Sequence, residues 1–173
     1  SVAYGYDALN RLVTETVTDP VAGNSSFAYA YDSVGNIVSR TVNGVPTALT
    51  YDANNRLLQD GGTTYTYDNN GNTLTRNVGG AITTLAYDGE NRLVSESGAG
   101  GNHSYTYDAD GARRSATHGG VLTRYLVDKN RPLAQVLEER DAAGALQVSY
   151  VWGNALVSQA RGGVRSHYHH DAM

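Results

Sequence analysis

The dipeptide Tyr-Asp recurs six times along the chain, and each time Gly or Asn stands three positions after the Asp. Asp is favoured at the first position of a type I turn, because its carboxylate accepts a hydrogen bond from the backbone two residues on. Gly and Asn readily take the positive φ that closes such a turn between antiparallel strands. The expected turn residues are Asp7 with Asn10, Asp32 with Gly35, Asp52 with Asn55, Asp68 with Gly71, Asp88 with Asn91, Asp108 with Gly111 and, without the tyrosine, Asp141 with Gly144.

The segments that flank these turns alternate like strands. In residues 64–67, Thr-Tyr-Thr-Tyr, the two tyrosines share one face and the two threonines share the other. A second kind of turn lies between the Tyr-Asp turns, in the form of Asn-Gly and Gly-Gly dipeptides that suit two-residue hairpin loops. We therefore predict an all-β fold, an antiparallel meander of hairpins that forms a curved, spiralling β-sheet, such as the wall of a shell or tube.

The Tyr-Asp turns fall into two classes that alternate. The residues three and four positions after the Asp are Asn-Arg in one class, and Gly followed by Asn or Ala in the other. We interpret this alternation as two structurally distinct kinds of hairpin that meet different neighbours.

The composition indicates a thin, tyrosine-rich sheet. The 173 residues are 40% hydrophobic and include 13 Tyr, but one Phe, one Met and one Trp, so a thick core is not expected. We expect the tyrosines of the repeats to pack on the inner face, namely Tyr6, Tyr31, Tyr51, Tyr67, Tyr87 and Tyr107. Residues 1–173 are interpreted as one repeat array, regular over 1–123 and degenerate over 124–173. Because the chain starts in mid-repeat, both ends are expected to continue in something longer.

Charge and hydropathy exclude two classes of partner. The formal net charge is −4 and no basic stripe is visible, so nucleic acid is not expected to bind. No run of 18 apolar residues is present, and we therefore expect no membrane span. The chain has no cysteine, which leaves the redox compartment open.

Two groups of side chains could carry chemistry. His167, His169 and His170 with Asp171 resemble metal ligands, but alternation along a strand allows at most two of the three histidines to cooperate. We favour a structural or surface role and assign no metal. The repeated aspartates could be the carboxylate pair of a glycosidase, but their presence at every repeat favours turns. No other catalytic motif is present, so we expect no catalytic residue, no cofactor and no enzyme activity.

The tyrosine rows permit a second function. Tyr29 with Tyr31, Tyr65 with Tyr67 and Tyr105 with Tyr107 would stack as cross-strand ladders inside a wall. If they were exposed instead, the same rows would form a platform for sugar rings, as in a cell-surface adhesin that binds carbohydrate.

The repeated motifs YDxxGN and YDxxNRL resemble those of the RHS/YD-repeat proteins. The C-terminal series resembles the end of their repeat region, ahead of a core-associated segment; it comprises 124–139 (RYLVDKNRPLAQVLEE), 149–163 (SYVWGNALVSQARGG) and 167–173 (HYHHDAM). The resemblance implies a spiralling sheet that, in bacterial toxin systems, encloses a toxin, while related proteins occur at cell surfaces. It therefore implies a secreted or cell-surface bacterial scaffold. Its partners would be the rest of its own array, further copies in a homopolymer, or a toxin cargo. The resemblance implies that the self-cleavage segment of cocoon-forming members would lie beyond residue 173.

Overall fold

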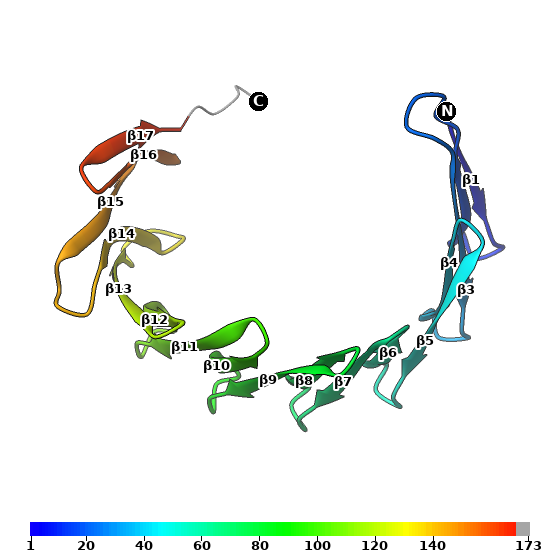
Figure 1. The fold of residues 1–173 in the computed structure, drawn as a ribbon, viewed down its shortest axis with the longest axis horizontal. Helices are drawn as coiled ribbons and strands as arrows, with labels where there is room; N and C mark the ends of the chain where they lie inside the picture. Colours follow the sequence, from blue (N-terminus) through cyan, green and yellow to red (C-terminus); the bar gives the residue numbers. More distant parts are fainter. Residues whose placement is uncertain (169–173) are drawn as a thin grey trace. The chain divides into compact units, whose positions relative to one another are not determined.

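The computed structural model describes residues 1–168, and these form seventeen β-strands without a helix (Figure 1). The all-β prediction is confirmed for these residues. The chain divides into two compact units, one over Ser1–Ile82 and one that begins at Thr83. Each unit is an antiparallel meander, because every strand pairs with the strand next to it in sequence.

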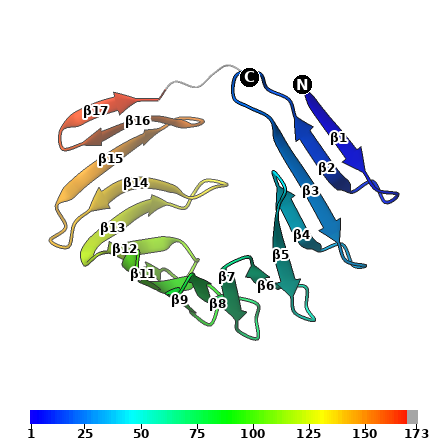
Figure 2. The same ribbon diagram turned by 45° about the vertical axis from the view of Figure 1, so that its right-hand side comes forward.

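In the first unit, β1 to β8 pair in chain order with antiparallel register (Figure 2). Their bounds are β1 Val2–Tyr6, β2 Leu12–Val17, β3 Ser25–Tyr31, β4 Ile37–Val42, β5 Val45–Tyr51, β6 Leu57–Asp60, β7 Thr63–Tyr67 and β8 Thr73–Val78.

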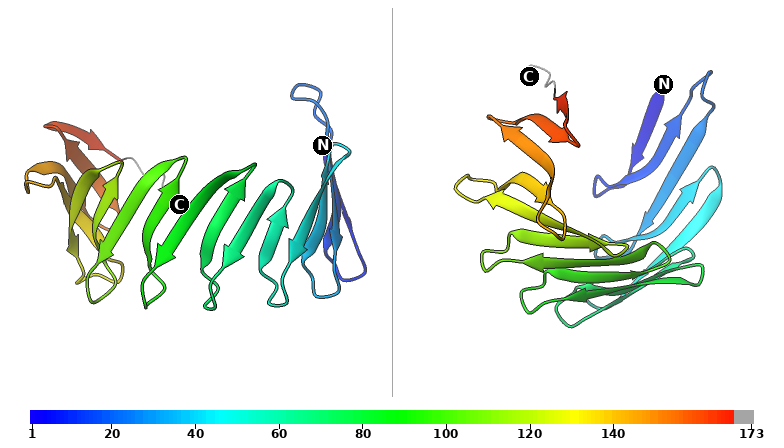
Figure 3. Two further views of the ribbon diagram at one scale, coloured as in Figure 1. Left: turned by 60° about the horizontal axis from the view of Figure 1, so that its bottom comes forward. Right: turned by 60° about the vertical axis from the view of Figure 1, so that its left-hand side comes forward.

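In the second unit, β10 to β17 continue the same pattern, and β9, which begins at the boundary between the units, pairs with β10. Their bounds are β9 Ala81–Tyr87, β10 Leu93–Gly98, β11 Gly101–Tyr107, β12 Arg113–His118, β13 Val121–Asp128, β14 Gln135–Arg140, β15 Leu146–Trp152, β16 Leu156–Arg161 and β17 Val164–His167. Within each unit the sheet is a single layer (Figure 3).

A β-bulge recurs beside the Tyr-Asp turns. Tyr31 pairs with Ile37 while Ala30 pairs with Ser39, so that Val38 is an extra residue on the returning strand. The same shift occurs at Tyr67, where Leu74 is the extra residue, and at Tyr107, where it is Arg114. Because a bulge bends its strand and increases local twist, its repetition at each hairpin coils the sheet within each unit.

The second kind of turn has the expected backbone. Asn43 and Gly44 both take a positive φ, of 49° and 83°, between the paired residues Val42 and Val45. Positive φ at both central positions is the requirement of a type I′ turn, whose twist matches that of the strands it joins.

Burial is as sparse as the composition suggests. Among residues 1–168, the buried side chains are Ala116 and Val148, each 0% exposed, and Ser158, 2% exposed. A single-layer sheet has no second layer to cover it, so its stability depends on strand pairing and on side-chain contacts between neighbouring hairpins. In the described part of the chain there is no helix with the length and apolar character needed to cross a membrane.

Candidate functional site

Each Tyr-Asp turn is closed by its own aspartate. In the Asn-Arg class, Asp88 Oδ1 accepts hydrogen bonds from the backbone N–H groups of Glu90 and Arg92, both at 3.0 Å. Its second oxygen accepts from Arg92 Nε at 2.7 Å, and the N–H of Asn91 donates to the Asp88 carbonyl at 3.0 Å. The same contacts recur at Asp7 and Asp52.

The glycine class closes the turn in the same way but with a different side chain. Asp32 Oδ1 accepts from the N–H groups of Val34 and Asn36, and Asp32 Oδ2 accepts from Asn36 Nδ2 at 2.9 Å. Gly35 has φ 100°, whereas Asn91, its counterpart in the other class, has φ 59°. The alternation in the sequence therefore corresponds to two kinds of hairpin.

These contacts keep the turn carboxylates ionised. The pKa of Asp88 is lowered, first by the hydrogen bond from the Arg92 backbone and then by the Arg92 side chain. The pKa of Asp32 is lowered mainly by the Asn36 side-chain amide, and that of Asp108 mainly by Lys129, which binds both Asp108 and Asp110. Carboxylates held in the charged form by three or more donors are suited to closing turns and unsuited to general-acid catalysis.

Successive hairpins are joined by the tyrosine hydroxyls. The hydroxyl of Tyr107 donates to the backbone carbonyl of Leu93, the first strand residue after the preceding turn, at 2.8 Å. The equivalent bonds are Tyr31 to Leu12 at 2.7 Å, Tyr51 to Ile37 at 2.9 Å and Tyr67 to Leu57 at 2.7 Å. Each tyrosine thus links its own hairpin to the hairpin before it.

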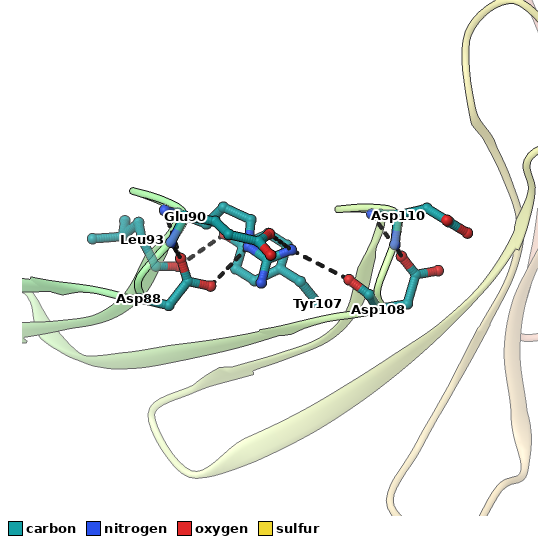
Figure 4. A network of polar contacts seen from close by, with 8 residues as sticks. Asp88, Glu90, Leu93, Tyr107, Asp108 and Asp110 are labelled. Carbon is teal, nitrogen blue, oxygen red and sulfur yellow. Dashed lines mark hydrogen bonds and ion pairs between the residues drawn. The ribbon is translucent and has the colours of Figure 1, made fainter.

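Arginine provides a second link from the Asn-Arg hairpins. Arg92 Nη1 donates to the carbonyl of Asp108 in the next turn at 3.2 Å, and the guanidinium carbon lies 5.0 Å from the ring centre of Tyr107. Figure 4 shows Tyr107 between the turn aspartates Asp88 and Asp108. Arg11 reaches Asp32 and Tyr31 in the same manner, and Arg56 reaches Asp68 and Tyr67. One guanidinium therefore closes its own turn, caps the next one and covers a tyrosine ring.

Glycine-class hairpins make a different forward link. Asn36 Nδ2, besides closing its own turn, donates to Asn55 Oδ1 in the following hairpin at 2.9 Å. At the Asp108 turn the corresponding residue is Ala112, which has no side-chain donor, and Lys129, the residue that follows β13, binds the carboxylate instead. Asn-Arg hairpins therefore contact the glycine-class hairpins that follow them, and Asn36 makes the converse contact.

The positions of the predicted tyrosines can now be stated. Tyr31, Tyr51, Tyr67, Tyr87 and Tyr107 are half-buried. Tyr6 differs, since it is 59% exposed in the first strand, and the packing expected for it is not observed. The expected ladders of stacked tyrosines are replaced at Tyr31, Tyr67 and Tyr107 by arginine over the ring.

Trp152 is a linking residue that the sequence analysis does not predict. Trp152 Nε1 donates to the Val136 carbonyl at 2.7 Å, as the tyrosine hydroxyls do in the regular repeats. The spacing of Tyr150 and Trp152 repeats that of Tyr29 and Tyr31, and could have revealed it. Asp141 does form a turn, with Gly144 at φ 86°, and Gln147 supplies the side-chain donor.

The candidate metal ligands are only partly visible. His167 lies on exposed β17, whereas His169, His170 and Asp171 fall outside the described residues. Within residues 1–168 no three potential ligands come together to hold a metal ion.

Comparisons with known proteins agree with this geometry. The family model named Teneurin YD-shell matches residues 1–141. The crystal structure of TcdB2-TccC3 matches with a TM-score of 0.60 at 18% identity, over 94% of this chain and 10% of that chain. The crystal structure of TcdB2-TccC3-Cdc42 matches with a TM-score of 0.59 at 15% identity, over 93% of this chain and 12% of that chain.

This chain therefore spans about a tenth of the length of those similar chains. No protein of curated function matches it. At such low identity the solved structures show the fold, while the family model, which covers most of the sequence, shows the kinship. On the evidence of its linked Tyr-Asp hairpins and of residues 1–141, the chain belongs to the Teneurin YD-shell family of RHS/YD-repeat proteins.

Proposed function

We propose that this chain is a non-enzymatic segment of the wall of an RHS/YD-repeat shell, and that the shell encloses a toxin or another cargo polypeptide outside the bacterial cell. The observation that carries the proposal is the linkage of successive hairpins. The arginine of each Asn-Arg hairpin donates to the turn carbonyl of the following glycine-class hairpin, and the tyrosine of that following hairpin donates back to the Asn-Arg hairpin. Side chains that join successive repeats are suited to holding a continuous wall together.

The thinness of the sheet supports the same role. In the described range the fully buried apolar residues are Ala116 and Val148, and both lie in the second unit. Each unit therefore has two large surfaces and almost no interior of its own. A sheet of this kind separates one space from another, as a shell must. Its partners in this proposal are the rest of its own array and the enclosed polypeptide.

The two alternatives have less support. A carbohydrate-binding adhesin needs open tyrosine faces, but Arg11, Arg56 and Arg92 lie over three of the rings. The hydroxyls of Tyr31, Tyr67 and Tyr107, which could contact a sugar, donate instead to backbone carbonyls. A glycosidase needs one carboxyl group that retains its proton, whereas the pKa values of the turn aspartates are lowered.

Electron cryomicroscopy of the natural gene product tests the shell. We expect a closed, hollow particle with polypeptide density inside it. Limited proteolysis of the intact particle should leave that polypeptide uncut until a denaturant opens the wall. A long fibre, a homopolymer of open sheets or a cargo cleaved at the rate of free polypeptide would refute the proposal.

A further inference from the structure

An arginine-lined groove lies on one face of the second unit, away from the hairpin links. It has a volume of about 500 Å³, and its walls include Arg114, Arg124 and Arg140 together with Thr106, Ser115 and Leu126. The groove follows from the register of the sheet: Thr106 pairs with Ser115, Ser115 with Arg124, and Arg124 with Arg140. Arg114 is the extra residue of the bulge beside this row.

The placement of Arg124 directly opposite Arg140 is unfavourable for the sheet alone, because like charges on facing strand positions repel. One carboxylate relieves the repulsion: Glu138 binds Arg140 through Nε at 2.8 Å and Nη2 at 2.6 Å. Arg124 Nη1 donates to the backbone carbonyl of Ala142 at 3.0 Å, which neutralises no charge.

Within residues 1–168, Arg114 has no ion-pair partner. The neighbouring acid Asp141 accepts from the Ala145 N–H and from Gln147, both at 2.9 Å, and does not line the groove. Three guanidinium groups less one carboxylate leave two positive charges unmatched in the groove, although the chain as a whole is acidic. An external anion is the natural complement of these two charges.

The polar and apolar parts of the groove define the anion further. Thr106 Oγ1 and Ser115 Oγ lie 2.7 Å apart, and since their mutual bond needs one hydrogen, the other hydroxyl hydrogen can be donated outward. Leu126 is 50% exposed at the same groove and offers an apolar contact. Paired arginine forks, a hydroxyl and an exposed leucine suit the carboxylate and aliphatic stem of a glutamate side chain.

We propose that this groove binds an acidic polypeptide segment, with two carboxylates bound by Arg114 and Arg124. Nucleic acid is the competing occupant, because arginine also binds phosphate; the exposed Leu126 favours the aliphatic stem of a glutamate side chain. The assignment of the groove as an attachment point for an enclosed cargo rests on the proposed function of the chain as a shell wall. Its binding of acidic peptide is measurable whether or not a shell closes.

Fluorescence anisotropy with the purified 173-residue chain and a labelled oligoglutamate peptide tests the site. Loss of one charge-assisted contact weakens binding by about tenfold, so Arg114→Gln and Arg124→Gln should each lower affinity to that extent. The matched control is Arg165→Gln on exposed β17, which changes net charge equally but lies outside the groove. We expect it to bind like the parent chain.

Thermal unfolding of the same variants separates a binding role from a structural one. Arg114→Gln should unfold at the parent temperature, because Arg114 makes no ion pair within the described chain. Equal loss of peptide affinity in all three variants would show unspecific attraction and overturn the proposal. So would unchanged affinity in Arg114→Gln and Arg124→Gln, or binding of a single-stranded DNA oligonucleotide in place of the peptide. None of these outcomes depends on whether the natural particle is closed.

Discussion

The guanidinium carbon of Arg92 lies 5.0 Å from the ring centre of Tyr107, whose hydroxyl donates to the carbonyl of Leu93, the residue next to Arg92. Two neighbouring hairpins are thus joined by reciprocal contacts: an arginine of the first covers a tyrosine of the second, and this tyrosine binds back to the first. In a sheet with so small a core, such contacts replace much of the stabilisation that buried side chains provide elsewhere.

Arg92→Lys should destabilise the second unit although it keeps the charge. Arginine donates from Nε to Asp88 and from Nη1 to Asp108 in one planar group, whereas lysine has a single side-chain nitrogen and cannot reproduce both bonds in that geometry. We expect a measurable loss in the free energy of unfolding, determined by urea denaturation. Arg165→Lys on β17 is the control and should change little. Equal stability of the Arg92→Lys and parent proteins would show that the arginine link is incidental.

Tyr107→Phe removes one hydroxyl and leaves the ring under Arg92. The Leu93 carbonyl then loses its hydrogen bond, and we expect a cost of about 1 kcal/mol. Tyr6→Phe, at a tyrosine that is 59% exposed, should cost far less. The comparison is made by thermal unfolding of the two variants, and a similar effect of both would contradict the role given to the hydroxyl.

Gly71→Val tests the backbone of the glycine-class turn. Gly71 has φ 90°, and no atom lies within 4 Å of the position where a Cβ would be placed, so any cost arises from backbone strain. A β-branched residue at positive φ costs about 1–3 kcal/mol. Gly71→Asn should cost clearly less, since Asn55 and Asn91 occupy the equivalent position in the other class at φ 60° and 59°. Equal unfolding temperatures for the two variants would argue against a strained turn.

The wall should be labile in acid. The pKa values of Asp7, Asp32, Asp52, Asp68, Asp88 and Asp108 all lie below the ordinary 3.8. A carboxyl group whose pKa is lower in the folded state contributes stability that is complete above its unfolded pKa and is lost as pH falls through the folded pKa. We therefore expect the unfolding temperature to hold steady down to about pH 4 and to fall below it.

Asp88→Asn provides the control for this pH dependence. It should be less stable than the parent near neutral pH, because it loses the charge that binds Arg92, and the gap should narrow in acid as Asp88 of the parent is protonated. A constant gap across the acid range would indicate that Asp88 is not held ionised by its turn.

Tyr150 is expected to titrate late. Burial, followed by its hydrogen bond of 2.5 Å to Glu139, raises its pKa from 10.0 to about 12. The folded state prefers the neutral phenol, so this contribution to stability is complete below the ordinary pKa and is lost as pH rises towards the folded one. In an alkaline titration followed by phenolate absorbance, the Tyr150→Phe variant should show a smaller amplitude than the parent in the transition at the highest pH. A loss confined to the first transition would contradict the burial of this hydroxyl.

The turns could be predicted from sequence because their chemistry is local. Asp88 and Asn91 form their turn within five residues, so composition and spacing suffice. The link from Arg92 to Asp108 could not be predicted in the same way, because it depends on which side chains face one another once two hairpins have paired. Trp152 is not among the predicted linking residues for a related reason. Tryptophan and tyrosine are different residue types, but the indole N–H reaches the Val136 carbonyl as the tyrosine hydroxyls reach the equivalent carbonyls in the regular repeats. The bulge at Arg114 has no residue signature, since Val38 and Leu74 serve equally well.

The strict exchange between arginine-bearing and glycine-bearing hairpins also limits how such a gene can lengthen. Duplication of a single hairpin would place two hairpins of one class side by side. The arginine of one Asn-Arg hairpin would then lie against a turn whose aspartate is already bound by another arginine. Duplication of a consecutive pair restores every contact. Arrays of this kind are therefore expected to gain or lose material two hairpins at a time, and recombination breakpoints within related genes should keep that even count.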